Sequence, residues 1–342
     1  MLATACRAGE AALAQQLLDG LPPLDVLNAL ESRDGGTPLH WACYRSLDSI
    51  ALRLVAAPNV DIDARFGVDG TSPLWQSCNR RLSTVALALL STGRVDVRVR
   101  DSWDSTTPLW QAAKSGLEEV VLRLLDCDGI EPDVADVMVG VTPLWWVSYN
   151  GLPDAALRLL SLGVDVNAQH SSMGTTSFYW ACAKSLLCVA IALIETDCDV
   201  GAQREDGTTP LWHACGDPRL EDVALRILAA QITTAQGEAI IDLVDVNSGT
   251  TPLLRACANG LPKAALRLLE LGADANAVDV GGCSALRWAC KGGDKAVALR
   301  LRECGCLDDV LCGQTALRKG TGRERTARCV ELLQHGREGL GT

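Results

Sequence analysis

Cysteine and histidine are the residue types through which this chain would most readily do chemistry. His213 and Cys215 stand two residues apart, and an imidazole beside a thiol is the pairing that activates a cysteine nucleophile. Residues two apart on a helix do not face each other, however. We therefore expect no catalytic role for this pair.

A second group of candidate ligands lies toward the C-terminus. Cys304, Cys306 and Cys312, followed by Cys329 and His335, are residues of the types that bind zinc. Their spacing lacks the paired C-x-x-C sequences of structural zinc sites. Cys304 and Cys306 also align with the end of a sequence repeat, described below. No metal site is expected.

Other motifs that carry catalysis are missing from the sequence. The chain has four histidines, no glycine-rich phosphate loop, no G-x-S-x-G nucleophile elbow and no evident acid–base pair. The sequence therefore predicts a protein that is not an enzyme and that uses no cofactor.

Composition narrows the classes of partner and compartment. The 342 residues carry a net charge of −11, which disfavours nonspecific attraction to nucleic acid or to an anionic membrane. Fifteen cysteines, an odd number, and no Asn-X-Ser/Thr sequon favour a reducing intracellular compartment, which we take to be the cytoplasm. Arg7 and Glu10 interrupt the apolar N-terminus, so no signal peptide is expected. The long uncharged run 137–153 contains glycine and proline and does not suggest a membrane span.

Internal repetition is the strongest pattern in the sequence. A Thr/Ser-Pro-Leu triplet, or a weaker copy of it, recurs every 31 to 42 residues. The middle residues of the copies are at 38, 73, 108, 143, 177, 210, 252, 285 and 316. Most copies continue with an aromatic or polar residue and a small pair such as Ala42-Cys43, and several close with Gly-x-Asp-x-Asn, as at 163–167.

These phrases resemble the ankyrin repeat, whose period is about 33 residues and whose first helix opens with Thr-Pro-Leu-His. The resemblance covers nearly the whole chain. It implies an all-α solenoid of stacked helix-turn-helix units with projecting hairpin loops and a concave surface that binds proteins. The family is defined by binding rather than by one reaction.

The chemistry of the opening triplet predicts the same helix starts independently. A Thr or Ser side chain can accept a hydrogen bond from an unpaired backbone N–H at the N-cap, and proline suits the first helical position because it lacks that donor. Helices this short are marginal alone, so their stability must come from stacking on neighbours. We expect about ten units in one solenoid over 1–342, with an N-terminal cap at 1–33, central repeats at 34–311 and a C-terminal cap at 312–342.

Two departures from the family pattern stand out. The spacing of 42 residues marks an insertion near 229–244, either a longer second helix or an extra loop. The family histidine survives only as His40, and tryptophan replaces it at Trp75, Trp110, Trp145 and Trp212. We expect these tryptophans to be structural, filling space and using the indole N–H for a contact.

Two further residue types recur at fixed repeat positions. Cysteines at one first-helix position are expected to serve as small apolar residues, because stacked helices hold equivalent positions too far apart for a disulfide. They are Cys6, Cys43, Cys78, Cys182, Cys215, Cys257 and Cys290. Arginines on the second helices are expected to pair with nearby carboxylates on a solvated face. They are Arg53, Arg123, Arg158, Arg226, Arg267 and Arg300.

One face of each first helix lines the concave groove if the resemblance holds. Over eight helices this face carries six Lys or Arg residues and one acidic residue, Asp217, in a chain that is acidic overall. Aromatic and cationic side chains dominate binding energy at protein interfaces, although the tryptophans have the alternative of packing sideways on neighbouring repeats. The predicted partner-binding residues are Trp41, Tyr44, Arg45, Arg80, Lys114, Trp146, Tyr149, Trp180, Lys184, His213, Arg255, Trp288 and Lys291.

The function predicted from these features is that of a monomeric, non-catalytic scaffold or adaptor, which binds a protein partner with an acidic segment. An alternative that the resemblance permits is a substrate-recognition or regulatory subunit of an enzyme complex such as a ubiquitin ligase. Only six residues follow Gly336, so no C-terminal recruitment box is expected. Interleaved Trp and Arg residues also suggest single-stranded nucleic-acid binding, which the net charge disfavours.

Overall fold

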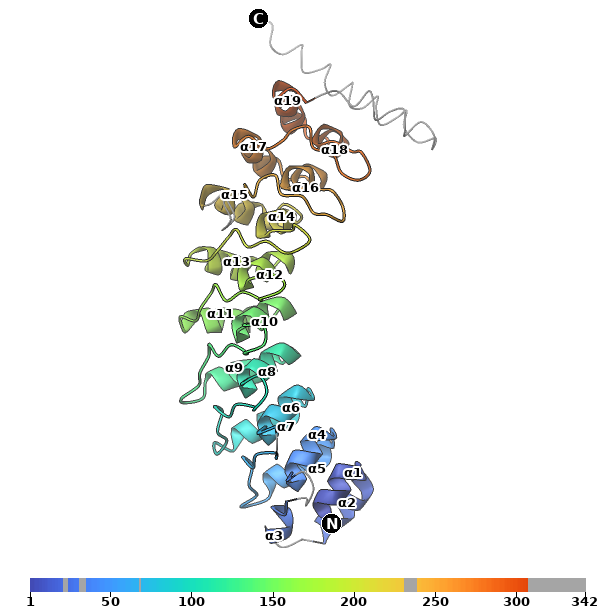
Figure 1. The fold of residues 1–342 in the computed structure, drawn as a ribbon, viewed down its shortest axis with the longest axis vertical. Helices are drawn as coiled ribbons and strands as arrows, with labels where there is room; N and C mark the ends of the chain where they lie inside the picture. Colours follow the sequence, from blue (N-terminus) through green and yellow to red (C-terminus); the bar gives the residue numbers. More distant parts are fainter. Residues whose placement is uncertain (21–23, 31–34, 68, 231–238, 307–342) are drawn as a thin grey trace, which may run out of the picture. The chain divides into compact units, whose positions relative to one another are not determined.

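The computed structural model describes residues 1–20, 24–30, 35–67, 69–230 and 239–306. The described residues are mostly helical, and the helices come in pairs, as the repeat predicts (Figure 1). The chain divides into two compact units, Met1–Ser171 and Ser172–Thr342. Each unit is a stack of ankyrin-type helix pairs, so the all-α fold is confirmed. That one solenoid runs through both units stays a prediction.

Unit 1 begins with the expected N-terminal helix pair. The pair is α1 (Leu2–Ala8) and α2 (Ala11–Asp19), and a further short helix, α3 (Leu24–Leu27), follows it. The repeats that come next each supply a first and a second helix. The first helices are α4 (Pro38–Tyr44), α6 (Pro73–Asn79), α8 (Pro108–Ser115) and α10 (Pro143–Asn150); the second helices are α5 (Asp48–Ala56), α7 (Ser83–Ser91), α9 (Glu118–Leu125) and α11 (Pro153–Ser161).

Unit 2 repeats the same arrangement. Its first helices are α12 (Ser177–Ala183), α14 (Pro210–Ala214), α16 (Pro252–Asn259) and α18 (Ala285–Gly292). Its second helices are α13 (Leu187–Ile194), α15 (Glu221–Ala230), α17 (Pro262–Glu270) and α19 (Lys295–Glu303), with a 3₁₀ turn, η1 (Pro218–Leu220), before α15. The predicted C-terminal cap, 312–342, lies outside the described residues, as do Cys312, Cys329 and His335.

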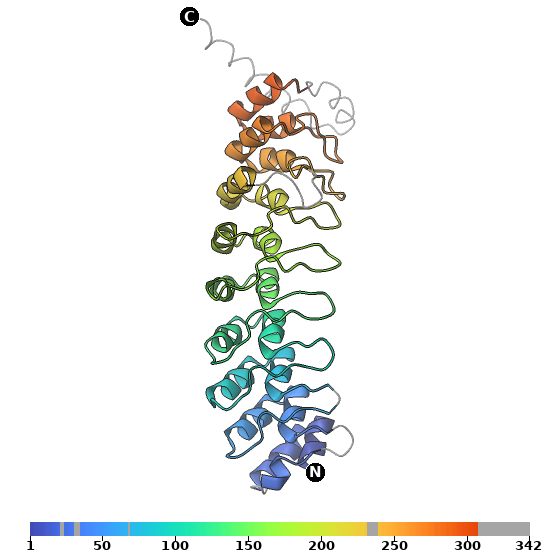
Figure 2. The ribbon, with the colours of Figure 1, turned by 60° about the vertical axis from the view of Figure 1, so that its left-hand side comes forward.

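Within each unit, first helices pack on first helices and second helices on second helices. In unit 1, α6 lies between α4 and α8, and α7 lies between α5 and α9. In unit 2, α16 contacts α14 and α18, and α17 contacts α15 and α19. The hairpin loops of each unit project on the side of its first helices (Figure 2). The core of each unit is therefore the layer between its two rows of helices.

The first helices begin where the opening triplet predicts. The Thr37 hydroxyl accepts a hydrogen bond from the His40 backbone N–H at 3.2 Å, and Pro38 occupies the first turn. The hydroxyls of Ser72, Thr107, Thr176, Thr209, Thr251 and Ser284 cap their helices in the same way. Thr142 caps α10 without a side-chain hydrogen bond. One polar residue and one proline thus fix the start of most first helices.

Hydrogen bonds between successive hairpins tie the repeats together in each unit. In unit 1 the Ser102 N–H donates to the Asp69 carbonyl oxygen at 2.9 Å, and the Val137 N–H donates to that of Asp104 at 3.2 Å. In unit 2 the Val246 N–H donates to the Asp206 carbonyl oxygen at 2.9 Å. These bonds satisfy loop backbone groups that helix packing leaves unpaired.

Only the two ends of the predicted insertion are described. Helix α15 continues to Ala230, and residues 231–238 lie outside the described part of the chain. On the far side, Ile240 and Ile241 are buried. The insertion therefore returns to the core of unit 2 before the next hairpin begins.

Candidate partner-binding site

All predicted partner-binding residues lie on a first helix or at the residue that ends it. Those of unit 1 come from α4, α6, α8 and α10, and those of unit 2 from α12, α14, α16 and α18. Shared position does not mean shared environment, because the side chains differ in burial and in partners. The two units are described in turn.

Tyr44, Arg45 and Arg80 form one cluster at the ends of α4 and α6. The Cζ atom of Arg80 lies 4.4 Å from the centroid of the Tyr44 ring, and that of Arg45 lies 5.6 Å away. The Arg45 Nε donates to the Arg7 carbonyl oxygen at 2.7 Å. Tyr44 is half-buried, whereas both arginines are exposed. A tyrosine ring flanked by two guanidinium groups is a rigid, positively charged surface feature.

Trp41 belongs to the packing beneath this cluster rather than to its surface. Its side chain is 5% exposed and makes edge contacts with the Phe66 ring at 5.1 Å and the Tyr44 ring at 5.5 Å between centroids. Trp41 thus follows the alternative of sideways packing. It fixes the position of Tyr44 and leaves little surface for a partner.

Lys114 and the tryptophans of α8 and α10 form a second cluster in unit 1. The Lys114 Nζ lies 4.9 Å from the Trp110 ring centroid and 5.7 Å from that of Trp146. Trp146 is half-buried and contacts Trp110 and Trp145 edge-on, with centroids 5.6 Å and 4.9 Å apart. Lys114 itself is exposed. The ammonium group therefore stands over an aromatic floor.

Tyr149 extends that floor toward solvent. Its ring stacks on Trp145 with centroids 5.3 Å apart and an interplanar angle of 7°, and the side chain is 36% exposed. Trp145 also contacts the His170 ring at 5.5 Å. Of the aromatic residues predicted in unit 1, Tyr149 offers the most accessible ring.

The cations of the two rows of helices differ in their partners. On the second helices, the predicted carboxylate pairs are confirmed for Arg53, Arg158, Arg226, Arg267 and Arg300. On the first helices of unit 1, Arg45, Arg80 and Lys114 face aromatic rings and have no ion pair among the described residues. The first-helix face of unit 1 therefore carries positive charge that forms no direct ion pair in the described part of the chain, although Lys114 lies close enough to Asp104 to lower the pKa of that carboxyl.

In unit 2, two of the predicted tryptophans are held by their own repeats. The Trp180 Nε1 donates to the Thr175 hydroxyl at 3.2 Å, and the Trp288 Nε1 donates to an Asp279 carboxylate oxygen at 3.2 Å. Lys291 lies over the Trp288 ring with Nζ 4.3 Å from the centroid. Lys184 follows α12 and is exposed.

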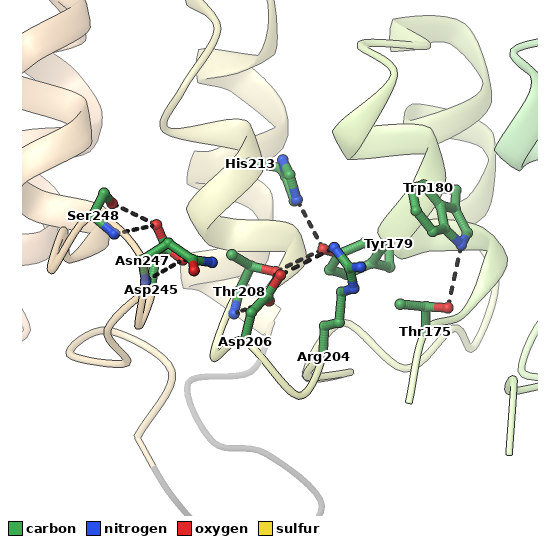
Figure 3. Close-up of polar contacts among 10 residues, drawn as sticks. All are labelled: Thr175, Tyr179, Trp180, Arg204, Asp206, Thr208, His213, Asp245, Asn247 and Ser248. Atoms are coloured by element: carbon green, nitrogen blue, oxygen red, sulfur yellow. Dashed lines mark hydrogen bonds and ion pairs between the residues drawn. The ribbon is translucent and has the colours of Figure 1, made fainter. Parts of the chain in front are cut away.

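His213 lies in a chain of polar side chains from α12, a hairpin and α14 (Figure 3). Its Nε2 is 3.0 Å from the Tyr179 hydroxyl, which is 2.6 Å from the Thr208 hydroxyl. Thr208 donates in turn to the Asp206 carboxylate, which pairs with Arg204 at 3.0 Å. Burial, reinforced by the nearby Arg255 guanidinium, lowers the pKa of His213 to about 4. The imidazole is therefore neutral at physiological pH.

Trp75, Trp110 and Trp212, which replace the family histidine, use the indole N–H for a contact, as predicted, and these contacts join successive repeats. The Trp75 Nε1 donates to the Thr106 hydroxyl at 3.1 Å, and the Trp110 Nε1 to the Val141 carbonyl oxygen at 2.8 Å. In unit 2 the Trp212 Nε1 donates to the Thr250 carbonyl oxygen at 3.0 Å. Each acceptor immediately precedes the Thr that opens the next repeat. The indole N–H thus orients the start of the following helix.

His40, which keeps the family residue, has lost the polar role. It is fully buried, and neither ring nitrogen has a hydrogen-bond partner among the described residues. Its ring stacks on Phe66 with centroids 4.3 Å apart. Burial lowers the pKa of His40 to about 3, so the imidazole is neutral in the folded protein.

The predicted cysteine positions are all buried. Burial raises the pKa of the Cys78 thiol to about 12, and it raises that of Cys6 to about 11. Such thiols are protonated and pack as small apolar side chains. His213 lies on α14 and Cys215 is the residue that ends it, without a hydrogen bond between their side chains in the described structure.

Hairpin aspartates are functional elements of the fold that the sequence analysis missed. The Asp101 carboxylate accepts from the backbone N–H groups of Trp103, Asp104 and Thr106. Asp136 and Asp245 occupy the same place in their loops. All three stand six residues before the Thr that caps the next helix, so a recurrent Asp at that spacing was the available signal.

Two protein-family models agree with this architecture. A family model described as Ankyrin repeats (3 copies) matches residues 178–279, and one described as Ankyrin repeat matches residues 34–65. No curated protein matches the sequence. Among solved structures, the ankyrin repeat domain of Bcl-3, titled a unique member of the IkappaB protein family, is 28% identical, with 65% of this chain and 96% of that chain covered and a TM-score of 0.43.

The two family models fall one in each unit, on segments whose capped first helices, paired second helices and laddered hairpins have been described. The same geometry recurs in the repeats between them. Residues 34–65 and 178–279 of this chain are therefore ankyrin repeats.

Proposed function

We propose that this protein is a non-catalytic interaction module, a scaffold or adaptor, that binds an acidic segment of a protein partner through the first-helix face. Ankyrin repeat proteins are typically interaction modules. The observation that carries the proposal is the set of exposed cations on this face in unit 1. Arg45, Arg80 and Lys114 flank aromatic rings and form no direct ion pair in the described part of the chain.

The chemistry of these clusters selects the class of partner. A cation beside an aromatic ring offers both charge and apolar area, which suits a segment with carboxylates and apolar anchors. Complementary potentials speed encounter, whereas buried aromatic contacts slow release. An acidic protein segment satisfies both features at once.

No helix in the described part of the chain combines the length and apolar character needed to cross a bilayer. The proposed binding face lies on short helices that stack within each unit. We propose that the protein acts as a monomer in the cytoplasm. Size-exclusion chromatography with light scattering, together with cell fractionation, tests these two points.

The test of the proposal is a comparative affinity capture. Wild-type protein, an Arg80→Glu/Lys114→Glu variant and an Arg53→Glu/Arg158→Glu variant are used as baits, and bound proteins are identified by mass spectrometry. The first variant reverses charge on the first helices and the second reverses charge on the second helices. Partners that bind through the proposed face are lost from the first bait and retained by the second.

The proposal is wrong if the same partners are recovered on all three baits. It is also wrong if both variants lose them equally while circular dichroism shows all three baits to be folded. Purified partners then allow the binding segment to be mapped, and its acidity checks the proposed class.

A further inference from the structure

Arg255 is the most constrained cation on the first helices of unit 2. Its guanidinium lies on the Trp212 indole, with Cζ 3.6 Å from the ring centroid. A Cβ atom at Gly216 would stand 1.9 Å from Nη2 and 2.8 Å from Cζ. The absence of a side chain at Gly216 therefore makes room for the guanidinium. One face of the Arg255 guanidinium packs on the Trp212 ring, and another side packs against the backbone at Gly216.

This guanidinium forms no direct ion pair in the described part of the chain, although the Asp245 carboxylate lies close enough to act on its pKa. Its Nε is buried without a hydrogen-bond acceptor. Arg267, on the next helix of the same repeat, pairs with Glu270 at 3.0 Å. Burial lowers the pKa of Arg255, a sign that removal from water is only partly compensated. Stacking on Trp212 stabilises the charge but provides no acceptor for the N–H groups.

The neighbouring His213 has one ring nitrogen committed and one available. Because Thr208 donates to Asp206, the Thr208 oxygen accepts from the Tyr179 hydroxyl, whose oxygen then accepts from His213 (Figure 3). This order of donors places the His213 proton on Nε2. The Nδ1 atom is left with no hydrogen bond among the described residues.

We propose that α14 and α16 form an oxyanion site, in which Arg255 binds a carboxylate or phosphate group of a protein partner and His213 is the second contact. This inference rests on the proposed function, and it assigns the anchor in unit 2. The planar fork of a guanidinium matches the oxygens of both groups. The source is an acidic side chain or a phosphorylated one.

Binding of the anion is coupled to the charge on His213. A bound oxyanion opposes the effect of Arg255 and favours the protonated imidazole, whose Nδ1–H then donates to it. Arg204 and Arg255 lower the pKa of His213, whereas Asp206 and Asp245 raise it. The anion therefore raises the pKa of His213, and by reciprocity it binds more tightly as the pH falls.

The experiment follows the His213 imidazole by NMR in the full chain. Inorganic phosphate and glutarate are titrated separately at matched ionic strength, with sodium chloride as the reference, and a His213→Asn variant assigns the resonance. We expect a saturable shift of the His213 resonance and a raised pKa. If phosphate alone produces the shift, the natural ligand group is a phosphorylated side chain. If glutarate produces the shift, the natural ligand group is a carboxylate.

Two variants locate the effect. Arg255→Gln removes the fork and is expected to weaken binding at least about tenfold. Arg267→Gln removes an ion-paired charge from the same repeat and is expected to leave it unchanged. If Arg255→Gln does not fold, Arg255→Lys keeps the charge without the fork and is expected to show an intermediate weakening.

The inference is wrong if neither anion shifts the His213 resonance. It is also wrong if the shift is undiminished in folded Arg255→Gln. Neither result touches the proposed function if captured partners still require Arg80 and Lys114. Conversely, if Arg255 binds anions but the captured partners do not depend on Arg80 and Lys114, the oxyanion site stands and the proposed function is wrong.

Discussion

The indole Nε1 of Trp110 donates a hydrogen bond of 2.8 Å to the carbonyl oxygen of Val141, 31 residues farther along the chain. Trp110 opens the first helix of one repeat, and Val141 immediately precedes the cap of the next. The bond is buried, so breaking it exposes neither group to water. In a stack stabilised by nearest-neighbour contacts, such a bond contributes to cooperativity between repeats.

Replacing Trp110 by phenylalanine removes the donor and part of the ring. The Val141 carbonyl oxygen keeps its bond from the Asp136 N–H, at 3.2 Å, so the loss is partial. We expect a free energy of unfolding lower by about 1 to 2 kcal/mol, from the lost hydrogen bond and the reduced packing. Urea denaturation followed by circular dichroism measures it.

Trp103→Phe is the matched control, because the Trp103 side chain is 71% exposed in a neighbouring hairpin. Its indole donates to Asp69 at the surface. We expect a change below about 0.5 kcal/mol, as for most surface substitutions. Equal losses in the two variants would contradict the assignment of Trp110 as an inter-repeat contact.

The buried His40 makes stability depend on pH. Its pKa is lowered by burial to about 3, below its ordinary value of 6.5, so the unfolded chain binds this proton first. The stability contributed by neutral His40 is complete above pH 6.5 and is lost as the pH falls toward 3. Between pH 7 and pH 5 the loss is about 2 kcal/mol.

His40→Leu is expected to flatten that part of the pH dependence, whatever its effect on absolute stability. Unfolding curves at pH 7 and pH 5 for both proteins give the difference, and His213 contributes equally to each. If the two proteins lose the same stability on acidification, His40 is not the titrating group.

Asp104 is expected to make stability depend on pH in the direction opposite to that of His40. Burial and the adjacent Asp101 carboxylate raise the pKa of Asp104 to about 6. Stability from the protonated form is complete below pH 3.8 and is lost as the pH rises through 6. Asp104→Asn, which is neutral at every pH, should therefore have the higher melting temperature at pH 7.5. This advantage should shrink at pH 5, and an advantage independent of pH would exclude the ionised carboxylate as its cause.

Both the backbone conformation and the close packing at position 207 require a glycine. Its φ is 83°, and an added Cβ would stand 2.1 Å from the Val244 carbonyl oxygen. Gly272 has φ 90° with nothing within 4 Å of a Cβ. Gly272→Ala should cost about 1 to 2 kcal/mol from the left-handed conformation alone. Gly207→Ala should cost clearly more, because the backbone at Val244, the end of the insertion, must also shift. Equal costs in thermal denaturation would contradict this contact.

Repeat periodicity made most of the fold predictable from the sequence. Thr37 and Pro38 determine a helix start through local hydrogen bonding and a fixed φ, so their recurrence placed the first helices. The role of Trp110 was also predictable in kind, since a buried indole needs an acceptor. Its acceptor, Val141, was not, because a backbone carbonyl carries no sequence signal.

The candidate site was less predictable than the fold. Helical spacing placed Trp41 and Tyr44 on one face, but burial depends on what packs from elsewhere, and Phe66 covers Trp41. The place of Gly216 beneath the Arg255 guanidinium follows from the approach of two helices. Such contacts are tertiary, and a single sequence does not encode them in any local pattern.

Charged and aromatic residues on the first-helix face of unit 1 are expected to affect different rates of partner binding. Arg80→Glu and Lys114→Glu are expected to slow association and to weaken its salt dependence, because exposed charges act mainly on encounter. Tyr149→Ala is expected to raise the dissociation rate, at a cost of about 1 to 4 kcal/mol if the ring is a hot spot. Trp146→Ala is a poorer probe, since Trp146 packs on Trp110 and Trp145 and its loss also disturbs the stack. Surface plasmon resonance with the captured partner measures both rates at two salt concentrations. Unchanged rates in all three folded variants would move the binding site away from these helices.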